Sequence, residues 1–240
     1  MRLLLVGCEY AGSTTLGRAI CLWSKDKLGG AYWLEPNGSI NYLHDHHTFP
    51  HTSGHGQEFT EEEMAGMMAL APRVKEMIQR HNIYYHLKST NYNRLDHINV
   101  GLHIEDGIYG NLYFDYGHRD GSWGDRDIEG AKIEKSIMSV APDTVLILVK
   151  ASPEVIRQRM KANPHVLSIL QDKDVEYVLQ RFEEEYAKST IPNRFVLDTS
   201  SSTEEESLQE FIEKIVPFFN DVDLARLETG VSRFTLEGKE

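Results

Sequence analysis

Cysteine, positive charge and long apolar runs are scarce in this 240-residue sequence. The two cysteines, Cys8 and Cys21, are too few for a disulfide framework, which fits a reducing cytoplasm. Lys and Arg number 25 against 37 Asp and Glu, and the formal net charge of −12 argues against a protein that neutralises a nucleic-acid backbone. No apolar run approaches the ~20 residues of a membrane span. We therefore expect a soluble, cytoplasmic protein with neither nucleic-acid nor membrane partners.

The apolar segments that are present are short and alternate with helical patterns. The first, at the N-terminus, runs directly into a glycine loop rather than a cleavage site, so it reads as a core strand and not as a signal peptide. Continuous apolar strands between helices are typical of a parallel sheet covered on both faces. We predict an α/β fold, a three-layer parallel sheet of about five strands with helices on both faces. The strands are expected at 3–8, 31–34, 98–104, 144–149 and 195–197.

Several helix boundaries carry local signals. Thr60 and Glu63 form a capping-box pattern that opens a helix through Gln79, with Pro72 as a kink or break. Ser152 and Pro153 open another helix as cap and first helical residue. Further helices are predicted at 14–23, 174–188 and 203–219. The stretches 37–58 and 111–127 have no clear periodicity and are read as binding loops or loose surface.

The strongest motif is a glycine loop directly after the first strand. Residues 7–14 follow the spacing G-x-x-x-x-G-K-[ST], except that Ser13 replaces the lysine. The pattern predicts a phosphate-binding loop, with Thr14 as the hydroxyl that contacts Mg²⁺. The alternative is a tight turn that needs its two glycines for backbone geometry alone. The predicted nucleotide contacts are Gly7, Ala11, Gly12, Ser13, Thr14 and Thr15.

With this loop, further segments resemble the P-loop nucleotide and nucleoside kinases, most nearly the thymidylate kinase-like group, over residues 1–216. Leu34-Glu35-Pro36-Asn37-Gly38 is similar to the acceptor-facing turn after that family's second strand. His103-Ile104-Glu105-Asp106-Gly107-Ile108-Tyr109-Gly110 is similar to the segment after its third strand. The resemblance implies a single domain at 1–220 with a lid at about 163–174, a peripheral tail at 221–240, ATP and Mg²⁺ as cofactors, and acceptor contacts from Glu35 and Tyr109.

The sequence departs from that family at one further position. The family carries an Asp-Arg or Glu-Arg pair before the third segment, and this chain has Val100 and Gly101 there. The usual catalytic carboxylate is therefore missing. Glu105 and Asp106 are the candidates to hold Mg²⁺ through water or to accept a proton, unless they only cap a helix.

The missing lysine calls for another cation, because phosphoryl transfer depends on charge neutralisation. Arg157 and Arg159, just before the predicted lid, are the candidates, since a guanidinium can clamp a phosphate with two hydrogen bonds. The alternative is that one or both, Arg157 above all, are solvated helix residues.

A histidine-rich stretch follows the predicted second strand. Imidazole and carboxylate groups suit zinc, but the spacing fits no standard site. We favour a substrate loop in which His47 contacts the acceptor, with a plain polar loop as the alternative. Nearby aromatic side chains either stack on a ligand ring or pack in the core. The stretch contains His44, Asp45, His46, His47, His51 and His55, flanked by Trp33, Tyr42 and Phe49.

Three functions remain open from the sequence. The first is a nucleotide-dependent phosphotransferase acting on a small molecule, with ATP held by residues 7–15. The second is a nucleotide-binding scaffold without turnover, suggested by Ser13, Val100 and Gly101. The third is a sulfotransferase, because residues 12–16 resemble a Ser-Gly-Thr-Thr loop, although Tyr10 and Ala11 stand where that class has a basic residue. The acceptor and the oligomeric state, a homodimer among the options, stay open.

Overall fold

The computed structural model describes residues 1–32, 43–46, 49, 59–87, 95–122, 124–165 and 168–229, and of residues 43–46 only the backbone. Within these residues, every helix is too short or too polar to cross a lipid bilayer.

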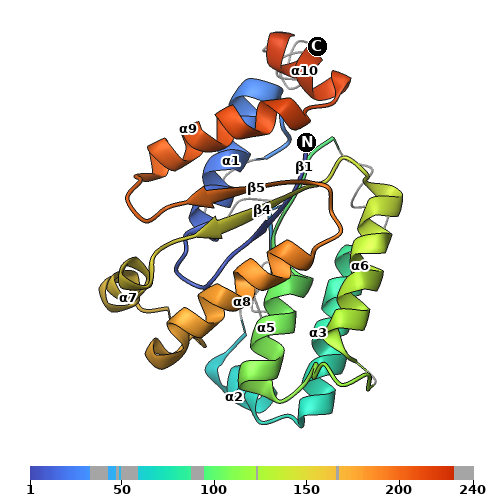
Figure 1. Cartoon of the computed structure of the whole chain (residues 1–240), viewed down its shortest axis with the longest axis vertical. Helices are drawn as coiled ribbons and strands as arrows, with labels where there is room; N and C mark the ends of the chain where they lie inside the picture. The colour runs from blue at the N-terminus through green and yellow to red at the C-terminus, as the bar shows by residue number, and fades with distance from the viewer. Residues whose placement is uncertain are drawn as a thin grey trace.

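The centre of the molecule is a parallel sheet, as predicted (Figure 1). Four strands lie side by side in the order β3-β1-β4-β5, and the short edge strand β2 extends this ladder to β2-β3-β1-β4-β5. Every ladder is parallel, so all carboxyl ends meet at one edge, where open α/β sheets bind ligands. The bounds are β1 (Arg2–Val6), β2 (Leu43–His46), β3 (His97–Gly101), β4 (Val145–Lys150) and β5 (Asn193–Asp198).

One predicted strand, 31–34, is contradicted at its first two residues. Residues 31 and 32 have no regular structure, and residues 33 and 34 lie outside the described part of the chain. The edge position is taken by β2 instead, in which Leu43 pairs with Ile98. Tyr32 is a buried member of the core, so its place in an apolar run requires no strand.

Helices cover both faces of the sheet, as predicted (Figure 1). α1 (Ser13–Leu28) and α9 (Glu204–Ile215) lie on one face, against each other. α5 (His103–Phe114), α6 (Arg126–Val140) and α8 (Val175–Lys188) lie on the other, with α3 (Pro72–His86) packed against α5. The core is formed by the buried strands, from Leu3 to Val6 and from Val145 to Val149, and by the inward helix residues.

The predicted helix starts are confirmed where a cap marks them. Thr60 and Glu63 form the capping box of α2 (Glu61–Met68). Pro72 is the first residue of α3, so the predicted helix through Gln79 is two helices. Ser152 caps α7 (Pro153–Ala162) by accepting the amide hydrogen of Val155. Thr203 and Glu206 likewise cap α9, which ends at Ile215 rather than Phe219 and continues as the turn Val216–Phe218.

The sequence did not predict α5. It placed a strand through Ile104, whereas β3 ends at Gly101 and the chain turns into α5 at His103. Gly101 has φ 73° and Leu102 has φ 153°, both outside the helical and strand regions, and they make this sharp turn. α6 and α10 (Asp221–Thr229) were not predicted either. In α10, Arg226 pairs with Asp96 at 2.6 Å and so ties the helix to the start of β3.

Candidate phosphate-binding site

The glycine loop joins β1 to α1 at the carboxyl edge of the sheet, as the motif predicted. Gly12 is the N-cap of α1 with φ 96°, a conformation that favours glycine, and no side chain caps this helix end. The first turn of a helix has amide groups without intrahelical acceptors and a positive dipole end. The first turn of α1 also contains no acidic residue. This end of α1 can therefore receive an anion.

The side chains at the start of α1 differ in exposure. Ser13, at the lysine position of the motif, is buried with 3% of its surface exposed. Thr14 is half-buried and Thr15 is exposed. Thr14 thus has the accessibility that a hydroxyl ligand of Mg²⁺ needs, whereas Ser13 adds no charge.

Gly7 is required by packing. A Cβ atom at this position would lie 2.3 Å from the carbonyl oxygen of Val149 in β4, far inside contact distance. The two glycines of the motif are therefore required for different reasons. Gly7 lies too close to a neighbouring strand for a side chain, and Gly12 has a backbone conformation that favours glycine. The tight-turn interpretation accounts for Gly7 without a ligand.

α5 supports the loop from behind. Glu105, which is fully buried, accepts the backbone N–H of Gly7 at 3.0 Å. One turn later the Tyr109 hydroxyl accepts the N–H of Glu9 at 2.9 Å. Residues four apart lie on one helix face, so both side chains reach the same loop. The two residues predicted for catalysis and for acceptor contact thus hold loop amides.

Two buried groups beside this contact, Cys8 and Tyr109, are uncharged. Burial raises the pKa of the Cys8 thiol to about 12. Burial also raises the pKa of Tyr109 well above its ordinary value. Cys8 therefore packs as a small apolar side chain and supplies no nucleophile at neutral pH.

Arg159 reaches the loop from α7. Its Nη1 donates to the carbonyl oxygens of Tyr10 at 3.0 Å and Ala11 at 3.2 Å, and its Nη2 donates to the carbonyl oxygen of Thr199 at 2.8 Å. The Thr199 hydroxyl donates to the same Ala11 carbonyl at 2.7 Å. Burial lowers the pKa of Arg159, although a guanidinium stays charged at neutral pH. The positive charge of Arg159 therefore lies at the loop, where its N–H groups point at carbonyl oxygens.

Arg157, two residues earlier, lies elsewhere. Its guanidinium pairs with Glu176 at 2.7 Å and with Asp172 at 3.0 Å. These ion pairs join α7 to α8 and to the turn before it. Only one of the two predicted arginines is therefore brought to the loop, and the catalytic role of Arg157 stays a prediction.

A contact that the sequence did not suggest joins the loop to the predicted lid. One Glu9 carboxylate oxygen lies 2.9 Å from Nδ1 of His165. The other oxygen accepts the backbone N–H groups of Ile169 at 3.2 Å and Leu170 at 3.0 Å. The rings of Tyr10 and His165 stack with centroids 4.1 Å apart. The one signal in the sequence was that Glu9 is the only acidic residue of the loop.

Asp106 faces away from the loop into a buried polar cluster between α3, α5 and α6. Its Oδ2 lies 2.6 Å from Nε of Arg126, and its Oδ1 accepts the Tyr116 hydroxyl at 2.8 Å. Arg126 also donates to Glu76 at 2.9 Å. Burial raises the pKa of Asp106, and the Arg126 charge opposes this shift. Asp106 is therefore engaged with Arg126, and its catalytic role stays a prediction.

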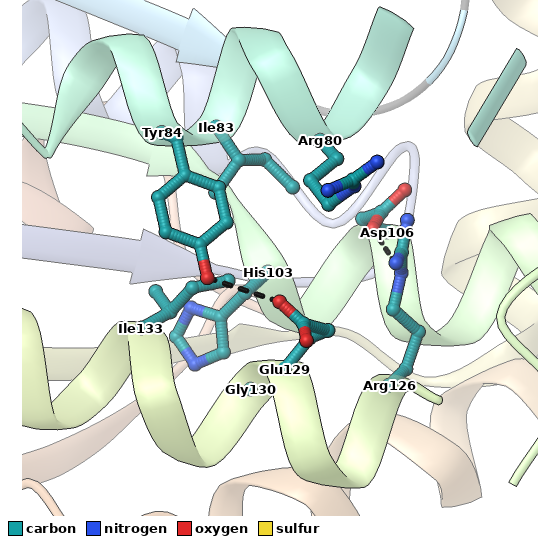
Figure 2. A pocket seen from close by; sticks show the side chains of 9 residues that line it. All are labelled: Arg80, Ile83, Tyr84, His103, Asp106, Arg126, Glu129, Gly130 and Ile133. Atoms are coloured by element: carbon teal, nitrogen blue, oxygen red, sulfur yellow. Dashed lines mark hydrogen bonds and ion pairs between the residues drawn. The ribbon is translucent and has the colours of Figure 1, made fainter. Parts of the chain in front are cut away.

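A small cavity of about 10 Å³ lies beside this cluster, and Figure 2 shows the side chains that line it. Arg126 and Asp106 approach each other at one end, and Tyr84 donates to Glu129 at 3.0 Å at the other. His103 lies on the side of Tyr84, and its buried Nδ1 has no hydrogen-bond partner among the described residues. The space is the size of one water molecule.

The adjoining face of α3 has unsatisfied polar groups. Both amide atoms of Gln79, which is 1% exposed, have no hydrogen-bond partner among the described residues, and the same holds for Oε2 of Glu76 and Nδ2 of Asn82. Buried groups of this kind are uncommon in folded proteins and need an explanation, such as an absent ligand or water.

The remaining predicted contacts cannot be placed. Glu35 and His47 lie outside the described residues, as do Trp33, Tyr42, His51 and His55. His44, Asp45 and His46 belong to β2, whose side chains are not described. Phe49 is buried against Phe114, with ring centroids 5.5 Å apart. In the described ranges no three His, Cys, Asp or Glu side chains gather as a metal site would require.

A larger cavity of about 430 Å³ opens where β4 and β5 end, on the α8 side of the sheet. It touches the loop at Cys8, and Lys150 and Glu183 form an ion pair of 3.1 Å at its border. Its volume lies in the range of small-molecule pockets.

Comparison with known proteins identifies the fold. No protein-family model matches the chain, and no curated protein sequence matches it. Thymidylate kinase from Candida albicans has a similar structure, with a TM-score of 0.55 and 15% identity over 92% of this chain and 95% of that chain. Deoxyadenosine kinase from M. mycoides matches with a TM-score of 0.51 and 14% identity over 91% and 100% of the two chains. The YorR protein from Bacillus subtilis, in complex with phosphorylated GDP, matches with a TM-score of 0.51 and 13% identity over 91% and 99%. At such identities the likeness concerns the fold, and this chain has the P-loop nucleotide kinase-like fold.

Proposed function

We propose that the protein is a nucleotide-dependent phosphotransferase that binds ATP with Mg²⁺ at residues 7–15 and acts on a nucleoside, a nucleotide or another small acceptor. The observation that carries the proposal is the uncapped N-terminus of α1 at the carboxyl edge of a kinase-like sheet. The structural neighbours include kinases that act on nucleosides and nucleotides, which favours this reaction class over the other uses of such a loop.

Apart from the missing lysine, the loop residues fit a nucleotide. The first-turn amides of α1 and the half-buried Thr14 suit phosphate oxygens and a nucleotide-bound Mg²⁺. The charge of the missing lysine has to come from elsewhere. In this proposal Arg159 holds the loop in shape, and the contribution of Arg157 depends on release from Glu176.

The acceptor is proposed to bind on the α3 and α5 side of the loop. Gln79 and Glu76 are buried there, with two amide atoms and one carboxylate oxygen that a ligand rich in hydrogen-bond donors and acceptors would satisfy. The predicted contacts from Glu35 and His47 belong to the same proposal.

Calorimetry with ATP in the presence and absence of Mg²⁺ tests nucleotide binding. A thermal-shift panel of ATP, GTP and 3′-phosphorylated adenosine ligands then ranks the donors, because a ligand at 100 times its Kd stabilises the fold by about 2.7 kcal/mol. Preference for the 3′-phosphorylated ligand over ATP would favour sulfuryl transfer instead. Absence of any nucleotide binding would contradict the proposal.

A second candidate is nucleotide binding without turnover. Ser13 at the lysine position and the ion pairs of Arg157 favour it. The Ser13→Lys variant separates the two functions in a phosphotransfer assay with a panel of nucleosides and nucleotides. Wild-type activity that Ser13→Lys does not improve indicates an active enzyme that neutralises the phosphate charge without the lysine. Activity that appears only in the variant indicates a nucleotide-binding scaffold.

A further inference from the structure

Four groups of His165, Ile169 and Leu170 converge on the loop residues Glu9 and Tyr10. The ring of His165 and the amides of Ile169 and Leu170 surround the Glu9 carboxylate, and the amide of His165 donates to the Tyr10 hydroxyl at 3.0 Å. The Glu9 side chain is 16% exposed in this contact. An ionised carboxylate only accepts hydrogen bonds, so three donors point at one anion.

The backbone of the loop is arranged for this contact. Tyr10 has φ 68°, a left-handed conformation that costs a residue other than glycine energy and persists only where its surroundings hold it. That conformation directs its ring onto His165 at an interplanar angle of 20°. The strained residue and the acidic residue are adjacent, and both face the same segment.

The three donors have the chemistry of a phosphate site. Consecutive backbone amides that point into a concavity bind anions, and a carboxylate and a phosphate oxygen accept the same kind of hydrogen bond. This donor set lies against the loop at which we propose that a nucleotide binds, in a site where the lysine is missing and Arg159 donates to carbonyl oxygens.

We infer that His165, Ile169 and Leu170 form an exchangeable anion site, in which Glu9 stands in for a phosphate group of the nucleotide. This inference rests on the proposed nucleotide site and gives it a substitute for the lysine. A polyphosphate displaces the Glu9 carboxylate, takes the two amides and gains the imidazole as a donor. Glu9 then acts as an internal competitor that occupies the donors of His165, Ile169 and Leu170 until a ligand arrives.

Amide hydrogen exchange at Ile169 and Leu170, resolved by NMR, tests the site without any activity assay. The two amides should exchange slowly in the wild type and at least tenfold faster in Glu9→Ala, because the acceptor is gone. Saturating inorganic pyrophosphate should restore slow exchange in that variant. Glu62→Gln, an exposed glutamate on α2, is the matched control and should exchange like the wild type.

Two results would overturn the inference. One is slow exchange at both amides in Glu9→Ala without ligand, which would mean that Glu9 does not protect them. The other is fast exchange of both amides in Glu9→Ala that pyrophosphate does not slow. This result counts against the inference whether calorimetry shows that pyrophosphate saturates the variant or shows no measurable binding.

Affinity measurements give an independent readout. The Kd for ATP should fall roughly five- to tenfold in Glu9→Ala, a usual size for the loss of a competing interaction. In the Glu9→Ala background, adding His165→Ala should raise the Kd for pyrophosphate by a similar factor, whereas an unchanged Kd would exclude the imidazole from the site. If ATP binds to none of the variants while pyrophosphate still slows exchange, the anion site stands and the proposed function falls.

Discussion

Glu105 accepts the backbone N–H of Gly7 at 3.0 Å, and this bond joins α5 to the phosphate loop. The Glu105 carboxylate is fully buried, and it serves as the hydrogen-bond acceptor for the backbone amide of Gly7 in place of a backbone carbonyl. Glu105, which the sequence predicted to be catalytic, thus stabilises the conformation of the phosphate loop.

Replacement of Glu105 should reduce stability in steps. Glu105→Ala removes the acceptor of Gly7 and should lower the free energy of unfolding by about 1–3 kcal/mol. Glu105→Gln keeps a carbonyl oxygen and should lose less. Urea denaturation measures both. Equal stability of the alanine variant and the wild type would show that the contact contributes nothing to the fold.

Gly7→Ala and Gly66→Ala should have opposite effects. A Cβ at Gly7 meets the Val149 carbonyl at 2.3 Å, so the strand or the loop must move, at a cost of about 1–3 kcal/mol or more. A Cβ at Gly66, an exposed position within α2, meets nothing within 4 Å and should stabilise by about 0.5–1 kcal/mol. Thermal and urea unfolding of the two variants compare the same chemical change in two environments. Tolerance of alanine at Gly7 would contradict the close approach.

Arg159 and Arg157 form a matched pair on one helix. Arg159→Ala removes the guanidinium donor from the carbonyl oxygens of Tyr10 and Thr199 and should destabilise the protein by about 2 kcal/mol, besides weakening nucleotide binding. Arg157→Ala breaks exposed ion pairs and should leave stability nearly unchanged. Urea denaturation measures the first effect and calorimetry with ATP the second. A larger loss of ATP affinity in Arg157→Ala would return that arginine to the nucleotide site.

Glu134 should make stability depend on pH. Burial pushes the pKa of its carboxyl upward, but hydrogen bonds from His103 and Thr190 outweigh burial and lower the pKa to about 2. The native state therefore favours the ionised form more than the unfolded chain does. The resulting stabilisation is complete above pH 4.5 and is lost as the pH falls toward 2. The shift corresponds to about 3 kcal/mol, which solvent screening reduces to about 2 kcal/mol.

The Glu134→Gln variant isolates this contribution. The difference in unfolding free energy between wild type and variant should be largest at neutral pH and shrink steadily below pH 4.5. Urea denaturation at pH 7, 5, 4 and 3 measures it. A difference that stays constant over this range would show that Glu134 has an ordinary pKa in the native state.

The sequence by itself determined the loop, the parallel sheet and the capped helix starts. These features depend on neighbours within a few residues: the glycine spacing at Gly7 and Gly12, the continuous apolar strands, and the caps at Thr60 and Ser152. The sequence did not predict α5 because residues His103 to Gly110 are all buried. A helix buried on all sides has no exposed polar face, so the helical period of its apolar residues cannot be recognised.

Only the tertiary structure decided which side chains meet the loop. Arg157 and Arg159 are two residues apart on one helix, and their sequence does not say which faces Tyr10 and which faces Glu176. Glu9 and His165 are separated by 156 positions, and no local pattern connects them. Such contacts follow from the packing of α5 and α7 against the carboxyl edge of the sheet, where the chemistry of the loop is set by side chains that the fold supplies from a distance.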